Sequence, residues 1–259
     1  MCIILACKAG KRPTAEVLEN CWDNNPDGAG VMYASGGVVH GHKGLMTFEE
    51  LGRVLGSVPE DVPLAVHFRI GTSGGYGPGV THPYPVSSAI GDLHATEWES
   101  PVGIAHNGVI NGMRTDNSAG VSDTVAYIRD VVAPLSSVKG GDLACHKAVD
   151  RLSATSKGSR LCVLEGDGEF VLTGSGWNQV CDGVSASNSS WRYSKPAVYR
   201  YTVPKRAANR LPGSCRGCDL AGWCRNDVPG CSDVAMLMGY PYDDFAMFWG
   251  LEEEVGTDA

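Results

Sequence analysis

The chain has 259 residues, of which 43% are hydrophobic and 19% charged, a balance typical of a folded globular protein rather than a disordered one. Its net charge of −8 and its dispersed basic residues argue against a nucleic-acid-binding surface, because phosphate neutralisation needs clustered Lys and Arg. The 34 glycines and 14 prolines imply many tight turns and favour a strand-rich architecture over a helical bundle.

The apolar segments of the sequence also bear on location. No stretch approaches the ~20 apolar residues that a membrane helix requires. The first residues lack the basic segment, apolar core and cleavage site of a secretory signal peptide. We therefore expect a cytoplasmic protein with no membrane partner, in which most of the ten cysteines are reduced.

The hydrophobic pattern predicts strands and helices in a mixed order. In chain order they are strand 3–6, helix 15–22, strands 31–34 and 38–42, helix 47–55, strands 62–70 and 102–106, helices 121–132 and 142–154, and strands 161–164, 169–172, 179–184 and 197–203. Helix 47–55 opens on a capping box formed by Thr47 and Glu50. Strands, then helices, then strands again favour an α+β fold of layered sheets and helices over a doubly wound parallel sheet.

The start of the chain carries a candidate nucleophile, Cys2. We expect removal of Met1, because the next residue is small, and this would leave Cys2 with both a thiol and a free α-amine. With unperturbed pKa values of about 8.5 for the thiol and about 7.7–8.0 for the amine, the amine can act as general base for the thiol. The alternative is a cysteine that is incidental to an apolar N-terminal strand.

Three further positions suit the recognition of an amino-acid amide. Asn107 and Gly108 end a strand and pair a side-chain amide with a backbone N–H, which would form an oxyanion hole, although Asn-Gly is also a common hairpin turn. Arg69 ends a buried strand and can bind a carboxylate through two parallel hydrogen bonds or pair with a structural Asp. Asp123, at a helix start, can receive an ammonium group or simply favour the helix dipole.

Together these positions describe a site for L-glutamine. Its α-carboxylate would meet Arg69 and its α-ammonium Asp123. Its side-chain carbonyl would lie at the donors of Asn107 and Gly108, where Cys2 would attack the carbon. The sequence therefore predicts hydrolysis of the glutamine side-chain amide.

Seven short motifs occur in order along roughly residues 1–205, at 1–3, 25–30, 67–69, 71–74, 82–83, 106–110 and 122–124. This ordered set resembles the class II glutamine amidotransferase domain of the N-terminal-nucleophile hydrolase superfamily. The resemblance implies a four-layer αββα sandwich, and no cofactor for catalysis. The site residues that it implies are the nucleophile Cys2, the oxyanion hole of Asn107 and Gly108, and glutamine binding by Arg69, Thr72, Gly108 and Asp123.

The resemblance also implies an ammonia acceptor, because amidotransferases of this class pass ammonia to a synthetase domain. Residues 206–259 are too few to form one, so we expect a separate synthetase subunit or a free-standing amidohydrolase. Two alternatives stand beside this reading: an amidohydrolase for another γ-glutamyl or amide substrate, and a catalytically idle binding or assembly module of the same fold. Assembly into a homo-oligomer is left open.

The segment 206–259 is rich in cysteine, and four thiols lie close together in it: Cys215, Cys218, Cys224 and Cys231. Four thiolates on a structural zinc would stabilise a segment too small to build its own core. An iron–sulfur cluster and a set of free thiols are the alternatives. The spacing matches no standard zinc finger, so it does not choose between them.

Overall fold

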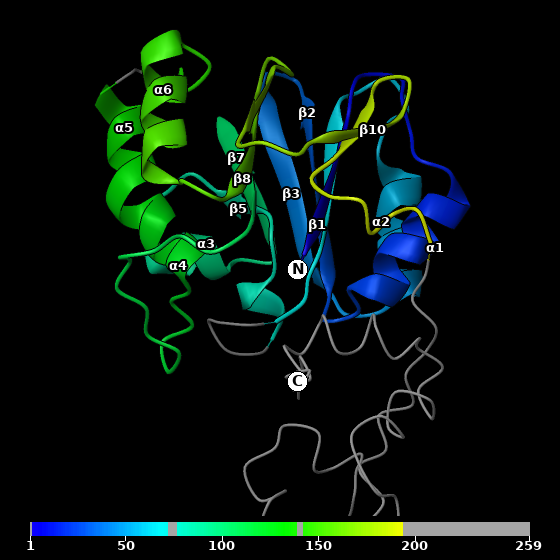
Figure 1. The fold of residues 1–259 in the computed structure, drawn as a ribbon, viewed down its shortest axis with the longest axis horizontal. Coiled ribbons are helices and arrows are strands. Elements are labelled where there is room, and N and C mark those ends of the chain that lie inside the picture. Colours follow the sequence, from blue (N-terminus) through cyan, green and yellow to red (C-terminus); the bar gives the residue numbers. More distant parts are fainter. Residues whose placement is uncertain (1, 72–76, 139–141, 194–259) are drawn as a thin grey trace, which may run out of the picture. The chain divides into compact units, whose positions relative to one another are not determined.

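The computed structural model describes residues 2–71, 77–138 and 142–193. In that part the strands are β1 (Ile3–Cys7), β2 (Ala29–Ser35), β3 (Val38–Leu45), β4 (Leu64–Phe68), β5 (Tyr84–Pro85), β6 (Glu97–Ser100), β7 (Val102–Asn107), β8 (Arg160–Glu165), β9 (Phe170–Thr173), β10 (Asn178–Cys181) and β11 (Val184–Ala186) (Figure 1). The helical segments are α1 (Ala15–Asn24), α2 (Phe48–Ser57), η1 (Pro78–Val80), α3 (Ile90–His94), α4 (Asp123–Tyr127), η2 (Ile128–Val132), α5 (Ala133–Val138) and α6 (His146–Thr155).

Strand β1 lies inside a seven-stranded antiparallel sheet with the strand order β10-β11-β1-β4-β2-β3-β6. All of its residues are buried, because both faces of the strand are covered. Pairing with β4 sets Ile3 opposite Phe68, so Cys2 and Arg69 come next to each other at the same end of the two strands. The register is strongly specified, because a slip by one residue would exchange the two buried faces.

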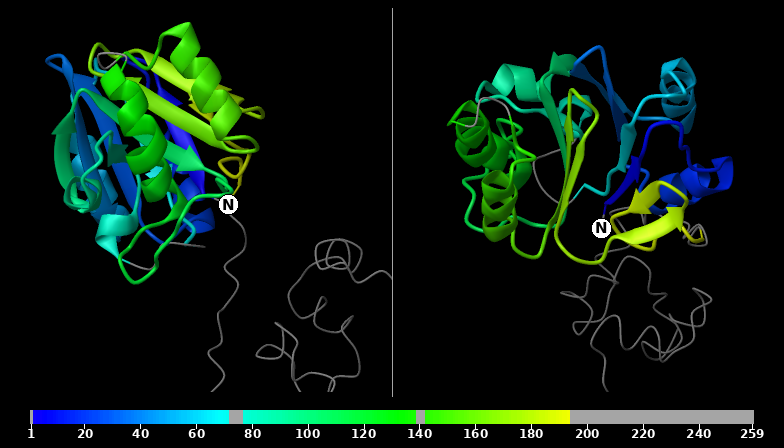
Figure 2. Two further views of the ribbon diagram at one scale, coloured as in Figure 1. Left: turned by 90° about the vertical axis from the view of Figure 1, so that its left-hand side faces the viewer. Right: turned by 90° about the horizontal axis from the view of Figure 1, so that it is seen from above.

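A second antiparallel sheet, with the order β5-β7-β8-β9, faces the first. Apolar side chains of both sheets fill the space between them, among them Ile4, Met32, Ala105 and Leu164. Helices α1 and α2 pack on the other face of the seven-stranded sheet, and α4, η2 and α6 pack on the other face of the four-stranded sheet. Figures 1 and 2 show these two sets of helices on opposite sides of the strands. The described part is therefore an α+β protein with antiparallel sheets, and the prediction of that class is confirmed.

Several predicted boundaries differ from the observed ones for local reasons. The expected helix 121–132 begins at Asp123, because Ser122 is its N-cap and accepts a hydrogen bond from the Val125 amide at 3.2 Å. The helix then continues through the wider turns of η2 into α5. The expected strand 179–184 is a hairpin of β10 and β11 that turns at Gly183, whose φ is +71°. Strand β6 was not predicted, because its sequence has no apolar alternation and only Ser100 of its four residues is buried.

The capping box predicted for 47–55 is present. The predicted strand 197–203 lies outside the described residues.

Candidate active site

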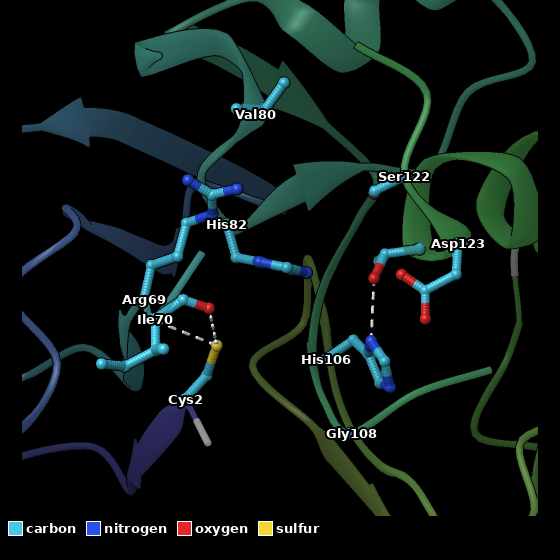
Figure 3. A pocket seen from close by; sticks show the side chains of 10 residues that line it. Cys2, Arg69, Ile70, Val80, His82, His106, Gly108, Ser122 and Asp123 are labelled. Atoms are coloured by element: carbon cyan, nitrogen blue, oxygen red, sulfur yellow. Dashed lines mark hydrogen bonds between the residues drawn. The ribbon is translucent and has the colours of Figure 1, made fainter. Parts of the chain in front are cut away.

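A pocket lies where β4 and β7 end and α4 begins, beside the start of β1. It is small and partly open to solvent, with about 370 Å³ of space between its walls when the open mouth is included. Its lining residues are Cys2, Arg69, Ile70, Val80, His82, His106, Gly108, Ser122, Asp123 and Thr124. Figure 3 shows Cys2, Arg69 and Ile70 on one side of the pocket and Ser122, Asp123 and His106 on the other. Four of the residues predicted for the site therefore line one pocket.

The Cys2 thiol is held against the backbone that follows β4. The Ile70 amide donates to its sulfur at 3.3 Å, and the thiol lies 3.5 Å from the Ile70 carbonyl oxygen (Figure 3). Burial raises the pKa of the thiol, and the Ile70 amide and the positive charge of Arg69 oppose that rise only in part. A thiol in this state is protonated near neutral pH, so nucleophilic chemistry here needs a base that accepts its proton.

Arg69 is buried, with 4% of its surface exposed, and its main chain is fixed by a neighbouring turn. Its amide donates to the Gly28 carbonyl at 2.8 Å, and its carbonyl accepts from the Asp27 amide at 3.0 Å. The Asp27 carboxylate also accepts from the Gly71 amide at 2.9 Å, which ties the chain after β4 to the same turn. The turn therefore sets the direction in which the guanidinium enters the pocket.

Gly108 lines the pocket, whereas its neighbour Asn107 does not. The φ of Gly108 is +143°, and a Cβ at this position would lie 2.6 Å from Ser159 Oγ, so only glycine fits. Asn107 is 1% exposed, and its Nδ2 donates to Ser187 Oγ at 2.9 Å. The expected pair of donors thus occupies adjacent positions of one strand end, with the Asn107 amide engaged by Ser187.

Asp123 is the first residue of α4 and reaches the pocket from the side opposite Arg69 (Figure 3). Its Oδ2 accepts from the Ile110 amide at 2.8 Å. This bond fixes the carboxylate while its two oxygens retain further acceptor sites. A cation in the pocket would therefore meet a held negative charge at this position.

Three histidines, His67, His82 and His106, are buried together behind and within the pocket. The centroid of the His82 ring lies 4.3 Å from that of the His67 ring and 6.2 Å from that of the His106 ring. His106 Nδ1 is 2.8 Å from Thr124 Oγ1, and His67 Nε2 is 3.2 Å from the His106 carbonyl oxygen. Burial lowers the pKa of His67 to about 3 and that of His106 to about 4, and it holds the pKa of His82 well below its usual range. All three rings are therefore neutral at physiological pH.

These histidines predict a loss of stability in mild acid. Each has a folded pKa below its unfolded value of about 6.5, so only the unfolded chain gains protons as the pH falls from there toward about 4. Between pH 6 and pH 5 the free energy of unfolding should fall by about 1.2 kcal/mol for each buried histidine. Urea unfolding over this interval measures the slope, and His67→Gln should reduce it by about one histidine's share. A free energy of unfolding that is constant between pH 6 and pH 5 would contradict this burial.

Two residues near Cys2 carry no signal in the sequence. Asn188 Nδ2 donates to the Cys2 carbonyl oxygen at 2.7 Å, and Ser187 Oγ accepts from the Ile4 amide at 2.9 Å. Both follow β11 and lie more than 180 positions along the chain from their partners. Only the pairing of β11 with β1 brings them to the site.

Some predicted positions lie outside the described residues: Thr72, Cys215, Cys218, Cys224 and Cys231. Within residues 2–71, 77–138 and 142–193, no group of three or more His, Cys, Asp or Glu side chains is arranged to hold a metal ion. No helix in this same part of the chain is long and apolar enough to cross a membrane.

Comparison with known proteins assigns no family to this chain. A scan against protein-family models and a search of the curated proteins both found no match to the chain. The geometry consists of a thiol, a guanidinium, a glycine N–H and a carboxylate around one pocket. These groups can supply a nucleophile, an anion-binding group, an oxyanion donor and a cation-binding group.

Proposed function

We propose that the protein is a glutamine amidohydrolase, in which Cys2 becomes N-terminal by loss of Met1 and cleaves the side-chain amide of L-glutamine. The observation that carries the proposal is the convergence of Cys2, Arg69, Gly108 and Asp123 around one pocket. An α-amino acid with a side-chain amide offers one matching group to each of them.

Recognition of the substrate rests on two opposite charges. Arg69 binds the α-carboxylate through parallel N–H donors, with Thr72 proposed as a second contact. Asp123 accepts from the α-ammonium group, assisted by the backbone at Gly108. Because the main chain of Arg69 and the carboxylate of Asp123 are each held by hydrogen bonds, the amide of a glutamine bound in this way is directed toward Cys2.

The reaction proceeds in two stages. The α-amine of Cys2 takes the thiol proton, and the sulfur attacks the amide carbon to form a tetrahedral intermediate whose oxyanion accepts from Gly108 N–H and the Asn107 amide. The intermediate collapses, the ammonium proton passes to the leaving nitrogen, and ammonia departs from a γ-glutamyl thioester. Water then attacks the thioester, with the amine again as base, and releases glutamate and the free thiol.

The proposal includes a fold family and an acceptor. Residues 1–205 would be a class II glutamine amidotransferase domain of the N-terminal-nucleophile type, a four-layer αββα sandwich. The helices that cover the outer faces of two facing antiparallel sheets support this. The ammonia would pass to a separate synthetase protein in the cytoplasm.

No cofactor is proposed for the chemistry, which the thiol, the amine and the hydrogen-bond donors supply by themselves. A structural zinc or an iron–sulfur cluster is proposed only for the cysteine-rich segment 206–259, separately from the reaction. Its ligands would be Cys215, Cys218, Cys224 and Cys231.

One observation favours a second candidate, an idle binding module with the same pocket. Ser187 Oγ engages one of the two N–H groups of the Asn107 amide, so only the other could join Gly108 N–H in stabilising an oxyanion. Such a protein would bind glutamine without cleaving it. Turnover therefore separates the two candidates.

The proposed function is tested by measuring ammonia release from L-glutamine by the purified chain, with its intact mass determined in parallel. We expect ammonia and glutamate in equal amounts from chains that have lost Met1. The methyl ester of glutamine should be a poor substrate, because it lacks the carboxylate for Arg69. Chains that begin at Cys2 and bind glutamine without releasing ammonia would support the idle module instead.

A further inference from the structure

Ser187 joins the two sheets beside the candidate nucleophile. It follows β11 directly, is fully buried, and exchanges two hydrogen bonds with Ile4 of β1. Its amide donates to the Ile4 carbonyl at 2.9 Å, and its Oγ accepts from the Ile4 amide at 2.9 Å. The same Oγ lies 2.9 Å from Nδ2 of Asn107, at the end of β7 in the other sheet. One hydroxyl thus connects the strand of Cys2 with the strand end that forms the oxyanion hole of the proposed function.

Strand alternation places Asn107 on the side of the sheet that Cys2 faces. Ile4 and Ala105 both lie in the core between the two sheets. Cys2 precedes Ile4 by two positions and Asn107 follows Ala105 by two, so alternation turns both side chains toward the space between the sheets. Gly108, the next residue after Asn107, lines the pocket with Cys2. Asn107 itself is buried outside the pocket lining, so strand alternation alone places its amide on the side of Cys2.

In the observed orientation of the Asn107 amide, two buried polar groups lack hydrogen-bond partners. With Nδ2 toward Ser187, the hydroxyl accepts two hydrogen bonds, and the described residues offer no acceptor for its own proton. Asn107 Oδ1 is buried and has no donor among those residues. A buried hydroxyl proton and a buried carbonyl without partners are each unfavourable. An amide oxygen on this side would also repel an oxyanion.

A half-turn of the terminal amide removes the conflict. The oxygen and nitrogen of an asparagine amide have nearly the same shape and exchange places when the amide turns. Ser187 Oγ then still accepts from the Ile4 amide and donates its proton to Asn107 Oδ1. The two N–H groups of Asn107 now face the space shared with Cys2. The oxyanion of a tetrahedral intermediate is the acceptor that such donors require.

We propose that Ser187 is a positioning residue, whose hydroxyl donates to Asn107 Oδ1 and so holds the amide nitrogen as the second donor of the oxyanion hole. The inference rests on the proposed function, because the oxyanion arises only when an amide is attacked. It also removes the observation that favoured an idle module, since both N–H groups of Asn107 are then free to face the oxyanion. Ser187 does not touch the substrate and acts through Asn107.

Two measurements test this role. The first compares Ser187→Ala with Ser185→Ala, a control on the same face of β11 whose hydroxyl makes no hydrogen bond among the described residues. Ser187→Ala should lower kcat for L-glutamine by about 10- to 100-fold with KM changed less than about twofold, because the donor acts on the transition state. Ser185→Ala should leave both constants close to those of the wild type. A kcat of Ser187→Ala equal to that of the control would overturn the proposal.

The second measurement is independent of turnover. An atomic-resolution crystal structure of the wild-type chain distinguishes the two ends of the Asn107 amide by bond length, about 1.23 Å for C=O and about 1.33 Å for C–N. We expect the short bond to point toward Ser187, and a long bond there would overturn the proposal. If the wild type releases no ammonia, the proposed function fails, while this structure still decides the orientation of the amide.

Discussion

Replacing Cys2 by alanine should reduce ammonia release from L-glutamine by at least about 10³-fold, because the thiol is the only group in the proposed mechanism that forms a bond to the substrate. The fold should persist. Within the described residues, the only hydrogen bonds of the Cys2 sulfur are those with the backbone of Ile70. The Cys2 carbonyl oxygen still accepts from Asn188 after the replacement. The free energy of unfolding should therefore change by about 1 kcal/mol or less.

A matched control separates loss of the nucleophile from loss of a thiol in general. Cys181→Ala removes an exposed cysteine of β10 that does not line the pocket. It should retain full activity. Glutamine hydrolysis by the Cys2→Ala variant at a rate near that of the control would remove Cys2 from the mechanism.

Replacing Arg69 by lysine should raise KM for L-glutamine by about 10- to 100-fold with a smaller change in kcat. A lysine keeps the charge but cannot present two parallel donors to a planar carboxylate, and a hydrogen bond to a charged group contributes about 1.5–3 kcal/mol. The backbone bonds of residue 69 to Asp27 and Gly28 do not involve the side chain, so the turn beside the pocket should persist. Steady-state kinetics with L-glutamine measure the effect.

Arg12→Lys is the corresponding control. Arg12 bonds to the carbonyl groups of Lys11 and Val62 and does not line the pocket. Its replacement should leave KM unchanged. Equal KM values for Arg69→Lys and Arg12→Lys would show that the carboxylate of the substrate does not meet Arg69.

Local signals are sufficient to select several of the pocket residues from the sequence. Arg69 and Gly108 stand at or just beyond the ends of apolar strands, and Asp123 starts a helix, so residue type and position together point to each of them. The capping box at Thr47 is likewise a local pattern, and it is present in the structure.

The contacts between distant segments are not contained in such patterns. The Ile70 amide that holds the Cys2 sulfur is 68 residues away, and its position depends on which strand pairs with β1. Ser187 is 183 residues from Ile4, and a serine after a short strand has no local feature that marks it. Strand partner choice is a property of the whole packed core, so a single sequence predicts elements more readily than the pairings that assemble a site.

The pKa shifts of the buried histidines are likewise not predictable from the sequence. His67, His82 and His106 stand in apolar or loop surroundings that would suit either a ligand or a packed ring. Their contact with one another arises from the meeting of β4, β7 and the segment before β5. The lowered pKa values follow from that shared burial, which no spacing in the sequence indicates.

The central claim, that Cys2 is the nucleophile of a glutamine site, is tested most directly by covalent labelling. The purified chain is incubated with a diazoketone analogue of L-glutamine, in which the reactive diazo carbon replaces the nitrogen of the side-chain amide. The product is examined by intact mass and by sequencing of the labelled peptide. We expect one adduct per chain, on the sulfur of a Cys2 from which Met1 is absent, and L-glutamine should slow its formation. An unlabelled chain, a label on another cysteine, or labelling that L-glutamine does not slow would contradict the account.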